Sequence, residues 1–163
     1  MRAVVKALST DRRFAGRVDI DRLALVGHSL GGYTVLGLGG AWPSWRLDGV
    51  RAILALTPYA LPFQRNEGLR KIAAPVMYHA GTLDPVFTLP LHTSGYAQTP
   101  APKYLVEFAT AAHMTWTDFG FYERASIVDY AIAFFDHYVR EAPAGPALAS
   151  KLPGVFRFAR DVR

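Results

Sequence analysis

The pentapeptide Gly27-His28-Ser29-Leu30-Gly31 constrains the fold of this chain more than any other feature. It follows a short apolar run at residues 23–27, which is typical of a strand buried on both faces. It precedes a segment rich in small residues, 31–39, which we expect to be helical. A G-x-S-x-G sequence between a strand and a helix predicts a sharp turn with the serine at its apex.

The residue types around this turn have physical explanations. Gly27 and Gly31 are expected because a large side chain two positions before or after the serine would collide as strand and helix approach. The free N–H groups at the start of the following helix favour negative charge. The backbone N–H of Leu30 is therefore one expected donor to an oxyanion. We interpret His28 as a packing or rim residue, because a tight turn points neighbouring side chains apart.

Apolar patterning predicts the rest of the fold. Three further apolar runs predict strands at residues 50–56, 76–80 and 103–108. The wide apolar face of residues 126–140 predicts a helix. A short helix is also expected near 66–72, and a loop with a weak helix over 84–98. Strands that alternate with helices predict an α/β fold, with a mainly parallel sheet of about four strands and helices on both faces.

We expect residues 1–163 to form one domain, since a chain of this length buries roughly 70% of the surface that it exposes when unfolded. The proline-containing tail, 141–163, is expected to pack loosely. No apolar run approaches the roughly 20 residues of a membrane helix, and the first residues do not resemble a signal peptide. These patterns do not fix the localisation.

Composition excludes some kinds of chemistry. The chain has no cysteine, which excludes disulfides, thiolate metal sites and a cysteine nucleophile. Its net charge is +5, but its arginines are scattered and no nucleic-acid-binding motif accompanies them. We therefore interpret the charge as a solvated surface and expect no nucleic-acid partner.

A serine hydroxyl needs a base to activate it, and the base needs an acid to orient it. His113 lies five residues beyond the fourth expected strand (113 − 108 = 5), and Asp84 lies four residues beyond the third (84 − 80 = 4). Function gathers at the carboxyl ends of parallel strands, where Ser29 also lies. We therefore predict Ser29 as nucleophile, His113 as base and Asp84 as acid.

Other candidates fit these roles less well. His79 lies inside an expected strand, and His137 lies on the last helix. His92 lies in the loop or weak helix after Asp84. Asp118 is close to His113 but begins the next segment, and Asp48 precedes a strand, at the opposite edge of the sheet.

With these motifs, the sequence resembles the α/β-hydrolase superfamily, in particular its dienelactone-hydrolase-like and platelet-activating-factor-acetylhydrolase-like serine esterases. The resemblance lies in four segments between Val18 and Asp118, in this order: VDIDRLALVGHSLGGYT, VRAILALTPYA, APVMYHAGTLDPV and KYLVEFATAAHMTWTD. The order and spacing of four motifs are far more specific than the pentapeptide alone.

The resemblance implies that Ser29, Asp84 and His113 form a catalytic triad. It also implies hydrolysis of a small-molecule carboxylic ester through an acyl-enzyme, with no metal and no organic cofactor. Thioester, amide or lactone cleavage would use the same motifs. Candidates for the walls of a substrate pocket are apolar side chains on loops at the same edge of the sheet: Tyr59, Leu61, Phe63, Val86, Phe87, Met114 and Trp116.

The chain also departs from the family. Only 28 residues precede Ser29, and they lack the several strands and the oxyanion loop that family members carry there. Residues 23–27 are therefore expected at a sheet edge, where an apolar strand is a pairing site. We expect either a homodimer through this edge or a fragment of a longer protein. The alternative to an esterase is a catalytically impaired hydrolase fragment that acts as a scaffold or dimerisation module.

Overall fold

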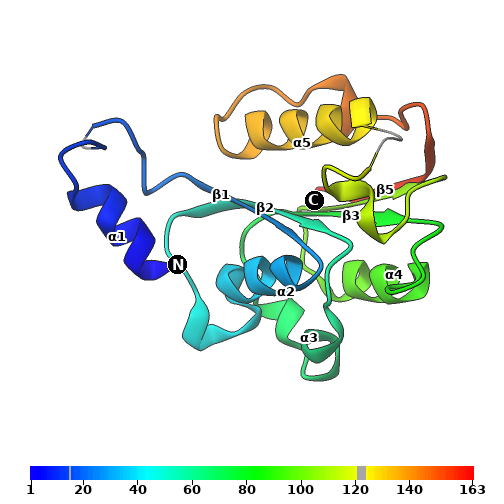
Figure 1. The fold of residues 1–163 in the computed structure, drawn as a ribbon, viewed down its shortest axis with the longest axis horizontal. Helices are drawn as coiled ribbons and strands as arrows, with labels where there is room; N and C mark the ends of the chain where they lie inside the picture. The colour runs from blue at the N-terminus through cyan, green and yellow to red at the C-terminus, as the bar shows by residue number, and fades with distance from the viewer. Residues whose placement is uncertain (15, 121–123) are drawn as a thin grey trace.

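A computed structural model describes residues 1–14, 16–120 and 124–163. A five-stranded sheet with the order β1-β2-β3-β4-β5 forms its centre (Figure 1). The strands are β1 (Leu23–His28), β2 (Val50–Leu56), β3 (Val76–Gly81), β4 (Lys103–Phe108) and β5 (Val155–Asp161). Neighbours among β1 to β4 pair in parallel, whereas β5 pairs antiparallel with β4. The expected α/β fold with a mainly parallel sheet is confirmed.

Helices flank both faces of the sheet. The flanking helices are α2 (Leu30–Leu36), α3 (Leu61–Arg65), α4 (Leu89–Gln98) and α5 (Arg124–Tyr138), whereas α1 (Arg2–Thr10) lies to the side of the sheet (Figure 1). Short helical turns occur at Gly37–Ala41, Pro43–Trp45, Gly68–Lys71, His113–Trp116 and Pro146–Leu148. Figure 1 shows α2, α3 and α4 on one face and α5 on the other. Within the described ranges, no helix has both the length and the apolar character needed to cross a bilayer.

Two apolar clusters fill the space between these layers. Leu36, Ile53 and Phe63 belong to the cluster on the α2 side, and Phe108 and Tyr130 belong to the cluster on the α5 side. All six residues of β3 are buried, as is usual for a parallel strand covered on both faces. The sheet is therefore packed on both faces, and its strands position the loops at their carboxyl ends.

The tail contains a fifth strand that the sequence patterning missed. Residues 141–163 were expected to pack loosely, but Val155–Asp161 form β5 and pair with the whole of β4. The ring of Phe158 stacks on Tyr130, with ring centroids 5.4 Å apart. Apolar and polar residues alternate only weakly along β5, because charged residues interrupt the pattern, so its sequence did not indicate a strand.

Strand β1 lies at one edge of the sheet, as expected. Among the described residues it pairs only with β2. Ala24 is exposed and Val26 is 52% exposed, whereas Leu25 is buried. One face of β1 therefore packs on the core and the other carries apolar side chains at the surface.

Candidate active site

The turn between β1 and α2 presents Ser29 in an unusual backbone conformation. Ser29 has φ 56° and ψ −115°, a region that residues with a side chain seldom adopt. Its N–H donates to the Leu56 carbonyl at 3.0 Å, and its carbonyl accepts from the Tyr33 and Tyr59 N–H groups, each at 3.1 Å. These hydrogen bonds tie the strained turn to the end of β2, to the loop that follows it and to α2.

The glycines beside the serine have different roles. A Cβ on Gly27 would collide with the Gly31 carbonyl, and a Cβ on Gly32 would lie 2.5 Å from the Pro58 Cβ. A Cβ on Gly31, in contrast, would meet nothing within 4 Å. The expectation of steric crowding is confirmed at Gly27 and is wrong at Gly31. Gly32, rather than Gly31, is the glycine that lets α2 approach the loop after β2.

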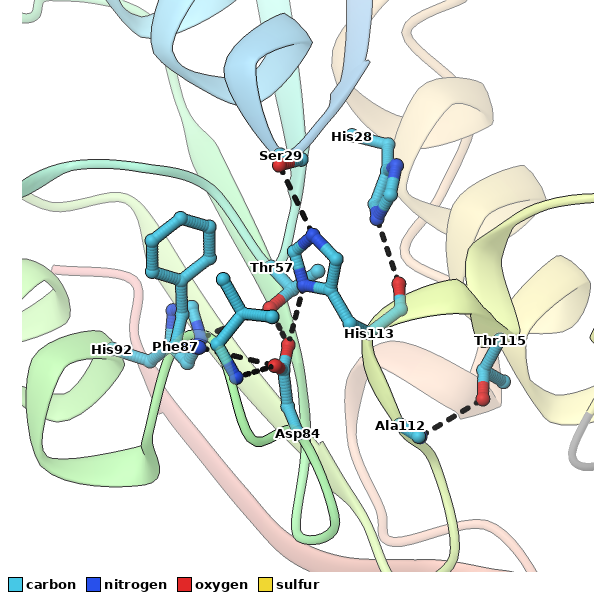
Figure 2. A network of polar contacts seen from close by, with 10 residues as sticks. His28, Ser29, Thr57, Asp84, Phe87, His92, Ala112, His113 and Thr115 are labelled. Atoms are coloured by element: carbon cyan, nitrogen blue, oxygen red, sulfur yellow. Dashed lines mark hydrogen bonds and ion pairs between the residues drawn. The ribbon is translucent and has the colours of Figure 1, made fainter.

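The side chains of Ser29, His113 and Asp84 lie in a line (Figure 2). Ser29 Oγ is 3.1 Å from His113 Nε2, and His113 Nδ1 is 3.0 Å from Asp84 Oδ2. An ionised carboxylate only accepts hydrogen bonds, so His113 must carry its proton on Nδ1. Nε2 is then free to accept the proton of Ser29. The structure thus brings together the three residues that the sequence analysis singled out.

The Asp84 side chain is fully buried and accepts several hydrogen bonds. Its Oδ1 accepts from the Val86 N–H at 2.8 Å and from the Phe87 N–H at 3.0 Å. Its Oδ2 accepts from the Thr57 hydroxyl as well as from His113. Burial by itself would raise the pKa of Asp84, but the hydrogen bonds from Thr57, His113 and the two backbone groups together lower it. The carboxylate is therefore held in its ionised form.

Two further residues of this network, Thr57 and His92, were not predicted. Thr57 follows β2, and its hydroxyl also lies 3.2 Å from His92 Nε2. His92 is 2% exposed on α4, and burial lowers its pKa to about 4. The position of Thr57 at the carboxyl end of a strand is a signal that could have identified it. No comparable signal marks His92, because its contact depends on how α4 packs.

His28 contacts the backbone of His113. Its Nε2 lies 2.7 Å from the His113 carbonyl oxygen, and the two rings are 4.8 Å apart. Burial is the main cause that lowers the pKa of His28. His28 is therefore half-buried packing at the rim of the site, as its interpretation as a packing residue anticipated.

The seven expected pocket residues do not all lie beside His113. The Phe87 ring stacks on Tyr59, with ring centroids 5.6 Å apart, and meets His113 edge-on at 5.3 Å, so Tyr59 and Phe87 form an apolar wall there. Val86, directly before Phe87, is 52% exposed, and Met114 is also exposed. Leu61 is half-buried, Phe63 is fully buried and stacks on Tyr33, and the indole nitrogen of Trp116 is buried.

Leu30 begins α2 directly after Ser29. Its N–H lies beside the serine and, like the other first N–H groups of a helix, has no intrahelical partner, so it is free to donate to an oxyanion. Met114 and Leu30 are both exposed, and the site is correspondingly open. Across residues 1–14, 16–120 and 124–163, no three His, Cys, Asp or Glu side chains are grouped as ligands of a metal ion would be.

Comparison with known proteins identifies a distant relative. No family model matches the chain. An alignment of 146 positions that covers 86% of this chain shows 28% identity to cutinase est2 of Thermobifida alba. The chain spans 44% of the length of that relative. The sequence is therefore distantly related to a carboxylic ester hydrolase, over a region that includes the elements around Ser29.

Proposed function

We propose that this chain is a serine hydrolase that cleaves carboxylic esters through an acyl-enzyme on Ser29. The observation that carries the proposal is the continuous line of hydrogen bonds from Ser29 Oγ through His113 to the buried Asp84. A serine at a strained turn, a base within reach and a buried acid are the arrangement that activates a hydroxyl. The distant cutinase favours esters over other acyl substrates.

In the proposed reaction, His113 Nε2 takes the Ser29 proton as Oγ attacks the ester carbonyl. Asp84 keeps the His113 proton on Nδ1 and stabilises the imidazolium that forms. The Leu30 N–H donates to the oxyanion of the tetrahedral intermediate. His113 then protonates the departing alcohol. Water, activated by the same base, attacks the acyl-enzyme and releases the acid and free Ser29.

The substrate class follows from the walls of the site. The apolar wall of Tyr59 and Phe87 beside His113, with the exposed Val86 next to it in the chain, favours short acyl or aromatic esters over charged ones. The motif order further supports a place among the dienelactone-hydrolase-like and platelet-activating-factor-acetylhydrolase-like esterases. This assignment needs neither a metal nor an organic cofactor.

A fluorophosphonate probe tests this function, because it labels only an activated serine. The wild-type chain is expected to gain one adduct on Ser29, located by mass spectrometry of its peptides. Ser29→Ala and His113→Gln are expected to remain unlabelled. Labelling of Ser29→Ala at the wild-type rate would show that the probe reacts elsewhere, and would contradict the proposal.

A second candidate function is a dimerisation module, which the edge position of β1 favours. Ala24 and Val26 are exposed, and one edge of β1 has no partner strand among the described residues, so β1 offers a site for a second copy of the strand. Sedimentation of the wild-type chain and of Val26→Lys tests this function. A dimer that dissociates in the variant is expected. A wild-type monomer in which β1 is protected from hydrogen exchange would exclude pairing.

A further inference from the structure

Thr57 and His92 extend the hydrogen-bond line beyond Asp84. Figure 2 shows the order Ser29, His113, Asp84, Thr57, His92. Thr57 contacts both Asp84 Oδ2 and His92 Nε2, and both Thr57 and His92 are almost completely buried. The mechanism proposed above uses neither residue, so the role of this pair is a separate question.

The hydrogens of this line can be assigned by counting donors. Asp84 is ionised and only accepts, so the single hydroxyl proton of Thr57 must be donated to Oδ2. The Thr57 oxygen is then an acceptor toward His92. Donation from His92 to this oxygen requires a proton on Nε2. Burial lowers the pKa of His92 to about 4, so near pH 7 the ring is neutral and carries one proton, for which the Phe87 backbone is a second acceptor. The contact with Thr57 favours the tautomer with this proton on Nε2.

The backbone of Thr57 is held as firmly as its side chain. Its φ is 39°, which for a β-branched residue is a marked outlier. Its N–H donates to the His79 carbonyl at 2.8 Å, which continues the pairing of β2 with β3. Strained conformations of this kind are retained where the surrounding structure requires them, often at functional sites. Here the strain places the hydroxyl between Asp84 and His92.

We propose that Thr57 and His92 are positioning residues, which orient Asp84 so that its Oδ2 accepts from His113 Nδ1. This inference rests on the proposed function for its effect on rate. Without the Thr57 proton, Oδ2 loses one of its two donors, and only the Val86 and Phe87 N–H groups on Oδ1 still orient the carboxylate apart from His113 itself. Oδ2 would then hold the His113 Nδ1 proton less firmly, and Nε2 would carry the proton in part of the molecules. Such molecules cannot accept the Ser29 proton.

Two pairs of variants separate the hydrogen bond from the volume of the side chain. Thr57→Val keeps the shape and removes the hydroxyl, whereas Thr57→Ser keeps the hydroxyl. His92→Phe removes the donor, whereas His92→Gln places an N–H₂ group near the former Nε2. Thr99→Val is a matched control, because it deletes another buried hydroxyl, bonded to Tyr78 and to the Gly95 carbonyl. Melting temperatures identify any variant that fails to fold.

The first readout is the rate constant for fluorophosphonate reaction with Ser29. Thr57→Val and His92→Phe are expected to lower it at least tenfold, while Thr57→Ser, His92→Gln and Thr99→Val stay within about threefold of wild type. For an ester substrate, the loss should fall on kcat rather than KM. Equal rates in Thr57→Val and wild type would overturn the inference while leaving the proposed function intact.

The second readout does not depend on activity. Imidazole ¹⁵N NMR reports which ring nitrogen carries the proton. In wild type we expect His92 protonated on Nε2 and His113 on Nδ1, and in Thr57→Val a mixture of His113 tautomers. A His92 proton on Nδ1, or an unchanged His113 tautomer in Thr57→Val, would overturn the inference. Failure of the wild-type chain to react with the probe would instead overturn the proposed function, and the NMR result would still decide this inference.

Discussion

The ring of His28 holds the backbone of His113: His28 Nε2 and the His113 carbonyl oxygen are 2.7 Å apart. His28 directly precedes Ser29, so this hydrogen bond joins the strand end that carries the serine to the turn that carries the histidine. The distance between Ser29 Oγ and His113 Nε2 therefore depends on a contact outside the triad.

This relationship predicts the behaviour of His28 variants. His28→Ala should lower the rate of Ser29 phosphonylation by several-fold and the free energy of unfolding by about 1 kcal/mol, the usual value of one hydrogen bond. His28→Gln, which can donate to the same carbonyl, should retain most of both. Stopped-flow labelling and urea denaturation measure the two quantities. A His28→Ala rate equal to that of wild type would show that the contact does not align the triad.

Gly31 and Gly32, in the turn between β1 and α2, are predicted to respond differently to the same substitution. Gly32→Ala should abolish labelling of Ser29 and destabilise the chain, because its Cβ would meet Pro58 at 2.5 Å. Gly31→Ala should fold and react nearly as wild type, since its Cβ enters open space. Thermal melts and probe labelling of both variants provide the measurement. Equal damage at the two positions would contradict the packing described for the turn.

Two buried histidines predict a loss of stability in acid. Burial lowers the pKa of His79 to about 3 and that of His92 to about 4, whereas both take up a proton near pH 6.5 once the chain unfolds. The unfolded state then binds more protons, so the free energy of unfolding falls as pH drops from 6.5 toward 4. Each histidine contributes a slope of up to about 1.4 kcal/mol per pH unit.

Denaturation between pH 7 and 5 tests this prediction. His79→Leu should remove one of the two contributions and flatten the slope by up to about 1.4 kcal/mol per pH unit. Leu36→Met, a substitution of similar volume in the apolar cluster on the other face of the sheet, should leave the slope unchanged. If His79→Leu and wild type show parallel pH curves, His79 does not remain neutral in the folded chain.

Strand β5 predicts different effects for two phenylalanines two positions apart. Phe158 stacks on Tyr130, so Phe158→Ala should lower the free energy of unfolding by about 2–3 kcal/mol, somewhat less than for a fully buried ring. Phe156 is 59% exposed, and Phe156→Ala should change it by no more than about 0.5 kcal/mol. Urea titrations compare the two variants. If both variants lost no more than about 0.5 kcal/mol of the free energy of unfolding, the tail would pack as loosely as its composition indicated.

The sequence was sufficient to predict those strands and site residues whose local pattern agrees with the overall fold. The apolar runs at β2 and β4 were predicted with the bounds that the structure gives, because strands buried on both faces are recognisable from apolar content alone. Ser29, Asp84 and His113 were expected to lie together because each comes just beyond a strand and parallel strands bring such positions to one edge, and their side chains do lie together.

The sequence was insufficient to predict the direction of side chains that tertiary packing determines. Phe63 was expected in the pocket, but α3 turns its ring into the core against Tyr33. His92 was placed in the loop or weak helix after Asp84 and given no role, although α4 buries it against Thr57. Side-chain direction on a short helix depends on its packing angle, which neither composition nor periodicity specifies.

The most direct test of the account is hydrolysis of a p-nitrophenyl short-chain ester by the 163-residue chain and by its Ser29→Ala variant. We predict turnover by the wild-type chain and a decrease of about 10⁴-fold or more in the variant, the scale of loss when a triad member is removed. Equal rates for the two proteins, at or above the uncatalysed background, would contradict the proposal that Ser29 is the nucleophile of an esterase.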